Sequence, residues 1–297
     1  MLFDRIDYNH WLRQHQLAAK NRFQPLYEAI ENAFNAIEES NTACGRVDIL
    51  VLRDLKQATL RAESGNPSRI GTPECPTGFV VTDNGVGLDE RNWSSFTTAY
   101  TPHKKARGGK GVGRLTYLLA FRSVVIDSYF KSAGKTWLRH LEIADDAEGA
   151  TTAEEPSEVV GRPTGTTVKL GLLRQQLQNQ CPKRADAIAG NIVRHFFRRL
   201  TQMRDIECVL RDEWDDTFLD LRKLCRQEYV YEQTPETIKV LGKQFHVTHV
   251  RCKPSVAGRH EAMLCVGGRV VKEKPIPPAF TVTVKPQGQR ILKSVER

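Results

Sequence analysis

Apolar positions recur along this chain with two different periods, and those periods predict its secondary structure. Apolar residues three to four positions apart predict helices at 22–39 and 185–204, and a further helix is predicted at 112–121. Short apolar runs, some of them alternating with polar residues, predict strands. In chain order these strands lie at 47–52, 79–82, 123–130, 136–143, 165–170, 207–211, 237–241, 246–251, 262–266 and 269–271.

The order of these elements predicts the fold class. A helix, two strands and a second helix come first and a meander of strands follows, which indicates an α+β fold with a mixed, largely antiparallel sheet covered by helices. The regular alternation of strand and helix that a doubly wound fold needs is absent. A boundary is expected near 172–184, which gives domains at 1–175 and 176–297. Loops or segments of little periodicity are expected at 61–77, 88–113 and 142–158.

The helix at 22–39 has one apolar and one polar face. At ~100° per residue, Asn32, Asn35 and Glu39 lie at about 40°, −20° and 20° from Glu28. The opposite side holds the apolar residues Leu26, Ile30, Ala33 and Ile37. A solvated face of an amphipathic helix accounts for this pattern. Two asparagines inside a helix lower its propensity, however, which points to a role for their carboxamides.

Two glycine-containing segments suggest that a ligand approaches the backbone closely. The segment 83–87 follows an apolar strand and has glycine at its third and fifth positions, although a simple turn would also use Asn-Gly. The segment 108–114 holds four glycines before a helix, and residues 101–122 include six basic residues and no acid. Backbone N–H groups at a helix N-terminus bind anions such as phosphate. The spacing matches neither a P-loop nor a Rossmann fingerprint, and a flexible linker is the alternative.

A further polar feature opens the strand predicted at 165–170. Gly165 precedes Thr166, whose hydroxyl can both donate and accept a hydrogen bond. Such a group suits recognition of a nucleobase, although Gly-Thr before a strand is also common in ordinary sheets.

The amino-acid composition indicates which classes of binding partner and which cell compartment to expect. The chain has 44 Lys and Arg residues against 35 Asp and Glu residues, and this net charge of +9 favours nucleotides, nucleic acid or an acidic protein. The seven cysteines are widely spaced and include no C-x-x-C pair, so free thiols are expected rather than a disulfide framework. No apolar run could cross a membrane and no signal peptide opens the chain, which predicts a cytoplasmic protein without a membrane partner.

Two other groups of residues have simpler explanations. The spacing of the histidines and cysteines between residues 246 and 265 matches no structural zinc site. The arginines of the helix at 185–204 would suit nucleic acid, but a solvated helix face explains them more simply.

The motifs together, in this order, resemble those of the GHKL superfamily of ATPases. That superfamily contains type II topoisomerases, heat-shock-90 chaperones, histidine kinases and MutL-type mismatch-repair proteins. The matching residues are Glu28 with Asn32, the D-x-G-x-G segment 83–87, the glycine-rich lid segment 109–113, and Gly165 with Thr166. The likeness spans residues 22–170. It implies that the first domain is a Bergerat-type two-layer α/β sandwich.

The resemblance also implies a site for ATP and Mg²⁺. Asn32 resembles the magnesium ligand, Glu28 resembles the general base that activates water, and Asp83 resembles the acid that accepts a hydrogen bond from the adenine amino group. Thr166 is expected to support the adenine contact through water. The other nucleotide contacts are expected at Asn35, Gly85, Gly87, Lys110, Gly111, Val112 and Gly113.

Within the superfamily, the hydrolysing branch is the better match, because Glu28 occupies the hydrolytic position. The segment 265–271 is similar to a strand–turn–strand of the transducer domain in MutL-like and topoisomerase-like members, and an ordinary hairpin is the alternative. A transducer lysine that reaches the γ-phosphate would be Lys272, Lys274 or Lys285. Family members close a lid and pair two heads on ATP, which implies a slow ATPase with a nucleotide-dependent homodimer or partner complex.

The process that such an ATPase serves is less constrained. The basic charge and the transducer-like segment favour a DNA-linked role, such as repair, chromosome maintenance or defence against foreign DNA. A chaperone-like remodeller and a nucleotide-gated binding module without turnover are the alternatives. The chain ends without an evident closing element, which suggests a piece of a longer protein.

Overall fold

The computed structural model shows two compact units in this chain. The first unit comprises Met1–Ile188 and Asp205–Leu219, and the second comprises Ala189–Arg204 and Asp220–Arg297. The structure describes residues 17, 21–40, 42–54, 73–97, 116–144, 151–203, 205–240, 242–252, 261–266, 269–275 and 290–296.

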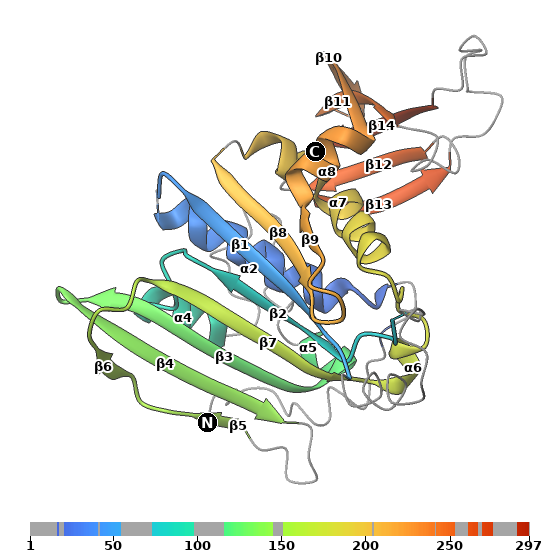
Figure 1. Cartoon of the computed structure of the whole chain (residues 1–297). Coiled ribbons are helices and arrows are strands. Elements are labelled where there is room, and N and C mark those ends of the chain that lie inside the picture. Colours follow the sequence, from blue (N-terminus) through green and yellow to red (C-terminus); the bar gives the residue numbers. More distant parts are fainter. Residues whose placement is uncertain are drawn as a thin grey trace, which may run out of the picture. The chain divides into compact units, whose positions relative to one another are not determined.

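A nine-stranded sheet forms the body of the first unit (Figure 1). Its strands are β1 Gly45–Leu52, β2 Gly78–Asp83, β3 Phe121–Ser132, β4 Lys135–Ala144, β5 Thr151–Ala153, β6 Ser157–Val159, β7 Gly165–Leu173, β8 Ile206–Asp212 and β9 Phe218–Asp220. Their spatial order is β5-β4-β3-β7-β2-β1-β8-β9, and β6 pairs with β4. The β1–β8 pair is parallel, whereas the pairs from β1 through β2, β7 and β3 to β4 are antiparallel.

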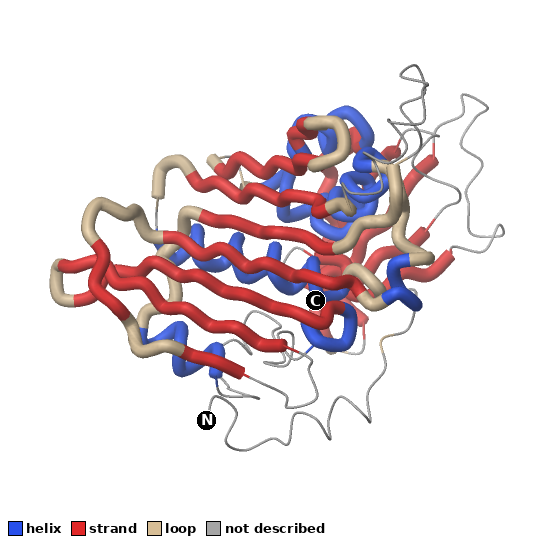
Figure 2. Tube along the Cα trace, turned by 60° about the horizontal axis from the view of Figure 1, so that its bottom comes forward, coloured by secondary structure: helices blue, strands red, loops and turns tan. Residues whose placement is uncertain are grey.

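Helices cover one face of this sheet, which we call the inner face. Helix α2 (Gln24–Ser40) packs on β1, β2 and β7, and Figures 1 and 2 show it behind these strands. Helix α5 (Tyr117–Ala120) contacts both α2 and β3, and α4 (Glu90–Thr97) follows β2 in the chain. Helix α6 (Gln175–Gln178) comes later in the first unit, and α7 (Ala185–Gln202) begins in the first unit and belongs to the second from Ala189 onward. The α+β class and the mixed, largely antiparallel sheet predicted from the sequence are therefore confirmed.

The period of each element explains the core of the first unit. Every second residue of a strand faces the helices, and in β3 the buried positions alternate with partly exposed ones. Helix α2 contributes Leu26 and Ile30 from its apolar face, as its spacing predicted. The rings of Phe79 and Phe121 meet edge to face with their centroids 6.2 Å apart. Burial of each such side chain contributes roughly 1.5–3 kcal/mol.

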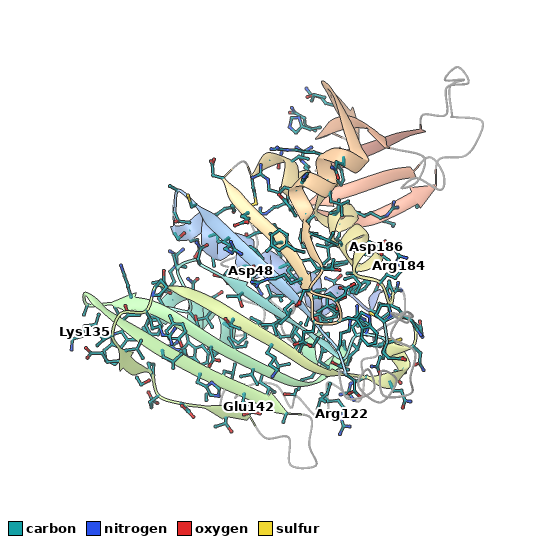
Figure 3. The ribbon with its side chains drawn as sticks, viewed as in Figure 1. Asp48, Arg122, Lys135, Glu142, Arg184 and Asp186 are labelled. Atoms are coloured by element: carbon teal, nitrogen blue, oxygen red, sulfur yellow. The ribbon has the colours of Figure 1, made fainter. Side chains whose placement is uncertain are left out.

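The opposite, outer face of the sheet carries charged residues. Arg46 Nε lies 2.6 Å from Asp48 Oδ2, and Arg211 Nη2 of the neighbouring strand lies 2.9 Å from Asp48 Oδ1. Figure 3 shows Asp48 on β1. Ion pairs in such exposed settings contribute little to stability.

The second unit has its own five-stranded sheet and the helix α8 (Leu221–Glu228). The strands are β10 Tyr229–Val240, β11 Lys243–Cys252, β12 Glu261–Val266, β13 Arg269–Pro275 and β14 Arg290–Glu296. Their order is β10-β11-β14-β12-β13, and the β12–β14 pair is parallel. The antiparallel β12–β13 pair corresponds to the strands predicted at 262–266 and 269–271.

The structure corrects the expected elements at three places. Residues 90–97, expected to lack periodicity, form α4, in which the Trp93 and Phe96 rings stack 6.0 Å apart. The acidic stretch 142–158, expected as a loop, contains β5 and β6, which pair with β4 and tolerate polar residues because they lie at the edge of the sheet. The sheet also takes in β8, beyond the boundary expected near 172–184. A parallel pair such as β1–β8 joins distant segments, which local pattern does not reveal.

Two further expectations concern the thiols and the membrane. The six cysteines with described side chains form no disulfide with one another, and four of them are buried: Cys181, Cys208, Cys225 and Cys265. This agrees with the free thiols predicted from their spacing. Within the described part of the chain, no helix is both long and apolar enough to cross a bilayer.

A buried ion pair joins four segments of the first unit. Arg53 follows β1, and its Nε and Nη2 donate to the two oxygens of Asp212 at 2.9 and 2.5 Å. The same guanidinium donates to the carbonyl oxygens of Glu74 and Lys183. The side chains of Arg53 and Asp212 are almost wholly buried, at 0% and 2% exposed. Loss of either partner would leave a buried charge uncompensated.

Replacing Arg53 should therefore destabilise the fold far more than replacing an exposed arginine. Arg53→Leu is expected to lower the free energy of unfolding by about 3–5 kcal/mol. Arg46→Leu, which removes a 44% exposed side chain of the outer face, should cost less than about 1 kcal/mol. Urea denaturation measures both values, and similar losses in the two variants would contradict this account.

Candidate functional site

Three polar side chains form a row across adjacent strands of the inner face. Asp83 ends β2, Thr166 lies directly opposite it in β7, and Ser128 lies opposite Thr166 in β3. We call these three residues the polar row. The neighbouring inner-face positions Val81 and Val168 are buried and apolar. Because opposing Cβ atoms of antiparallel strands are about 4.5–5.5 Å apart, the row is one continuous polar patch in an apolar surface.

Asp83 is the buried carboxyl group of the polar row, only 9% exposed. The Gly85 backbone N–H donates to its Oδ1 at 2.8 Å, and the Thr166 backbone N–H also bonds the carboxyl. Burial raises the pKa of Asp83 to about 7, and the two backbone hydrogen bonds only partly offset that rise. The group therefore changes charge near neutral pH, which is typical of ligand-binding and catalytic sites.

The loop after β2 packs tightly between α2 and β3. The Val86 N–H donates to the Ala36 carbonyl oxygen of α2 at 3.2 Å. A Cβ atom on Gly85 would lie 2.5 Å from the Ala36 carbonyl carbon, so only glycine permits this approach. Gly87 has φ +76°, and a Cβ atom there would lie 2.2 Å from the Tyr129 carbonyl oxygen. Both glycines of the segment are thus required by the backbone geometry.

Helix α2 presents the predicted polar side chains in a half-buried setting. Gln24 Nε2 donates to Glu28 Oε1 at 2.9 Å, which orients the carboxylate. Asn32 Nδ2 donates to the Tyr117 hydroxyl at 3.4 Å. A carboxamide that donates through its nitrogen keeps its oxygen for an acceptor or metal-ligand role. Asn35, three residues farther along, is also half-buried.

Position along α2 sets the length of the site. The loop after β2 docks at Ala36, which lies four residues from Asn32 and eight from Glu28. A rise of 1.5 Å per residue makes these separations about 6 and about 12 Å along the helix axis. A ligand that contacts both the polar row and Glu28 must therefore be an elongated molecule rather than a single small ion.

A buried arginine continues the row into β4. Arg139 lies directly opposite Ser128, is 3% exposed and pairs with Glu90 of α4. Its guanidinium carbon lies 4.5 Å from the ring centroid of Trp93 and 5.0 Å from that of Phe130. The cation–π contact with Trp93 holds α4 against the inner face, and the contact with Phe130 of β3 fixes the guanidinium there.

The structure brings together the predicted residues of the first unit that it describes. The loop and strand residues meet around the polar row: Asp83, Gly85, Gly87 and Thr166. Their loop docks on the helix that carries Glu28, Asn32 and Asn35. The remaining predicted contacts lie outside the described residues: Lys110, Gly111, Val112, Gly113 and the alternative lysine Lys285. Lys272 and Lys274 are exposed on β13 of the second unit.

The sequence reasoning missed three residues that the structure places beside this site. Ser128 stood between Ile126 and Phe130 at inner-face positions of a predicted strand, so the break in apolar alternation could have revealed it. Tyr117 and Arg139 gave no such signal, because their contacts with Asn32 and α4 depend on tertiary packing. Among the described residues, no group of three or more His, Cys, Asp or Glu side chains is arranged to hold a metal ion.

Comparisons with known proteins do not identify a family for this chain. No model of a known protein family matches the sequence. No curated protein matches it either. Among solved structures, the crystal structure of the N-terminal domain of a DNA repair protein is similar, with a TM-score of 0.46 and 14% sequence identity over 92% of this chain and 82% of that chain. A likeness at this level does not assign a function.

The packing of the loop after β2 predicts a difference between two glycines of similar conformation. Gly134 has φ +77° with open space around it, whereas Gly87 faces the Tyr129 carbonyl oxygen. Gly134→Ala should cost about 1–2 kcal/mol through backbone strain alone. Gly87→Ala should cost about 3–5 kcal/mol because a clash adds to the strain. Thermal denaturation checks this, and equal losses would show that the loop can shift freely.

Proposed function

We propose that this chain is a Mg²⁺-dependent ATPase that binds ATP along α2 and the polar row. The proposal rests above all on one arrangement: the buried Asp83 carboxyl, which titrates near neutrality, lies beside Thr166 and next to the helix with Asn32 and Glu28. The elongated spacing along α2 suits a ligand with a base at one end and phosphates at the other. The order of these residues in the sequence also resembles the GHKL motifs.

At the base end, Asp83 would accept a hydrogen bond from the adenine amino group. The backbone N–H groups of Gly85 and Thr166 already hold the carboxyl in place, so little ordering is needed when the base arrives. A bound amino donor favours the ionised carboxylate, so binding should release the proton that part of the Asp83 population carries at pH 7. Apolar neighbours of the polar row would contact the faces and edges of the ring.

At the phosphate end, Asn32 would hold Mg²⁺ through its carboxamide oxygen. A neutral oxygen ligand suits an ion that keeps several waters and binds through one or two protein groups together with substrate phosphates. The bond from Asn32 Nδ2 to the Tyr117 hydroxyl leaves the oxygen for this task, so the residues present fit the ion. When bound, the metal neutralises phosphate charge. The predicted lid residues Lys110, Gly111, Val112 and Gly113 would add donors to the phosphates.

Glu28 would serve as the general base for hydrolysis. Its carboxylate is oriented by Gln24 at 2.9 Å and lies one helical turn from Asn32, so one helix positions both groups. Glu28 takes a proton from a water molecule as the water oxygen bonds to the γ-phosphorus. The bond from that phosphorus to the β–γ bridging oxygen breaks, and ADP leaves.

The proposal also covers the nucleotide cycle of the ATPase and its binding partners. Closure of the lid segment 109–113 and pairing of two copies would complete the site, so turnover by the isolated chain should be slow. The net charge of +9 suits DNA or an acidic protein surface as a partner of a nucleotide-dependent homodimer. Tight ATP binding without turnover would instead favour a nucleotide-gated binding module, and a chaperone-like remodeller would bind unfolded protein rather than DNA.

Asp83→Asn should weaken ATP binding and remove its pH dependence. The folded-state pKa of about 7 means that the accepting carboxylate accumulates as pH rises through 7, so wild-type affinity should rise between pH 5.5 and 8.5. The variant should bind about 10- to 100-fold more weakly at pH 8, with a flat profile. Calorimetric titration measures both. Asp48→Asn on the outer face is the control and should behave as wild type; unchanged affinity in Asp83→Asn would remove the assignment of Asp83 to adenine.

Glu28→Gln should separate hydrolysis from binding. The amide cannot accept the proton, so the rate of phosphate release should fall about 100-fold or more while ATP affinity stays within about threefold. The control is Glu38→Gln, which changes an exposed glutamate of the same helix and should leave both quantities unchanged. Phosphate-release assays beside calorimetry provide the two readouts. Retained hydrolysis, or equal loss of binding and hydrolysis, would contradict the role of Glu28.

A further inference from the structure

The polar row contains a fully buried hydroxyl for which ATP hydrolysis alone gives no role. Ser128 is 0% exposed on the inner face of β3. Its Oγ accepts a hydrogen bond from the Leu88 backbone N–H at 2.8 Å. The same oxygen lies 2.9 Å from Thr166 Oγ1 and 3.5 Å from the Gly165 carbonyl oxygen.

The distances around Ser128 compare the two acceptors that its single proton could reach, Thr166 Oγ1 and the Gly165 carbonyl oxygen. An O–H···O hydrogen bond is normally about 2.5–3.0 Å long, so the Thr166 contact lies inside this range and the Gly165 contact lies outside it. The Leu88 N–H already occupies one lone pair of Ser128. Either hydroxyl could donate in the 2.9 Å contact, and when Ser128 donates to Thr166 Oγ1 the Thr166 hydroxyl directs its own proton away from Ser128.

We infer that Ser128 is a positioning residue that makes the Thr166 hydroxyl a hydrogen-bond donor toward the nucleobase. The hydrogen bonds then run in one direction, from the Leu88 N–H to Ser128 and from Ser128 to Thr166. The inference rests on the proposed nucleotide site and adds the cause of its base specificity. Asp83 offers an acceptor when ionised, and Thr166 beside it offers a donor.

This acceptor–donor pair matches adenine and opposes a 6-oxopurine. With the phosphates held along α2, the exocyclic group of the base faces Asp83 and ring N1 faces Thr166, directly or through a water that continues the chain. Adenine has an amino donor and an N1 acceptor at these positions, whereas hypoxanthine has an oxygen acceptor and an N1–H donor. Hypoxanthine would therefore place an oxygen against the carboxylate and a donor against a donor.

Ser128→Ala tests the inference through the preference for ATP over inosine triphosphate, measured by calorimetry with Mg²⁺. Without Ser128, the Thr166 hydroxyl can turn and accept, so the preference should fall about tenfold from the wild-type value, which is the effect of one hydrogen bond. Ser128→Thr keeps a hydroxyl and should restore the preference. Thr82→Ala is the matched control, because it removes the 3.2 Å hydroxyl contact with Thr167 on the outer face and should leave the preference unchanged.

The outcomes separate this inference from the proposed function. If the wild-type protein binds ATP and Ser128→Ala shows the same nucleotide preference, the role of Ser128 is contradicted and the assignment of the ATP site is not. Wild-type protein that binds neither nucleotide overturns both. If the alanine variant does not fold, Ser128→Cys supplies the test, since it keeps the shape and substitutes a weak donor. Its preference should also fall, and an unchanged preference again overturns the inference.

Discussion

Asp83 ends a buried strand with its carboxyl held by the backbone N–H groups of Gly85 and Thr166, and this burial constrains the rest of the site. The folded-state pKa of about 7 lies above the ordinary value of 3.8. The neutral Asp83 carboxyl therefore makes its full contribution to the free energy of unfolding below pH 3.8, and that contribution is lost as the pH rises through 7. Near pH 7 the protein holds a partly ionised group in an apolar surface. A ligand that donates a hydrogen bond there relieves this cost, which links fold stability to recognition.

The surroundings of Asp83 keep that carboxyl in place. Gly85 lets the loop after β2 approach α2 until the Val86 N–H bonds Ala36, and Arg139 holds α4 on the same face through Trp93. These contacts are made by backbone atoms and buried side chains, so the site depends on packing that is already present without a ligand. A preorganised carboxyl loses little freedom on binding, which in the proposed nucleotide site would favour specificity for one base over mere attraction by charge.

Local patterns in the sequence were sufficient for much of this structure. The periods of α2 and of the strands gave the inner face, and the glycines of segment 83–87 indicated close backbone approach. Long-range pairing was not accessible, because nothing local shows that β8 joins β1 across the expected boundary. Ser128 illustrates the same limit in the site, since its role follows from standing opposite Thr166 in a neighbouring strand. The lid residues 110–113 lie outside the described residues, so their role remains a prediction.

The central claim is that Asp83 recognises the base of a nucleotide whose metal is held by Asn32. Calorimetric titration of ATP and Mg²⁺ at pH 7, in two buffers with different heats of ionisation, counts the protons released on binding. A carboxyl with a pKa of about 7 should release about half a proton per ATP in the wild type and almost none in Asp83→Asn. Absence of binding, or binding with the same proton count in both proteins, would contradict the account.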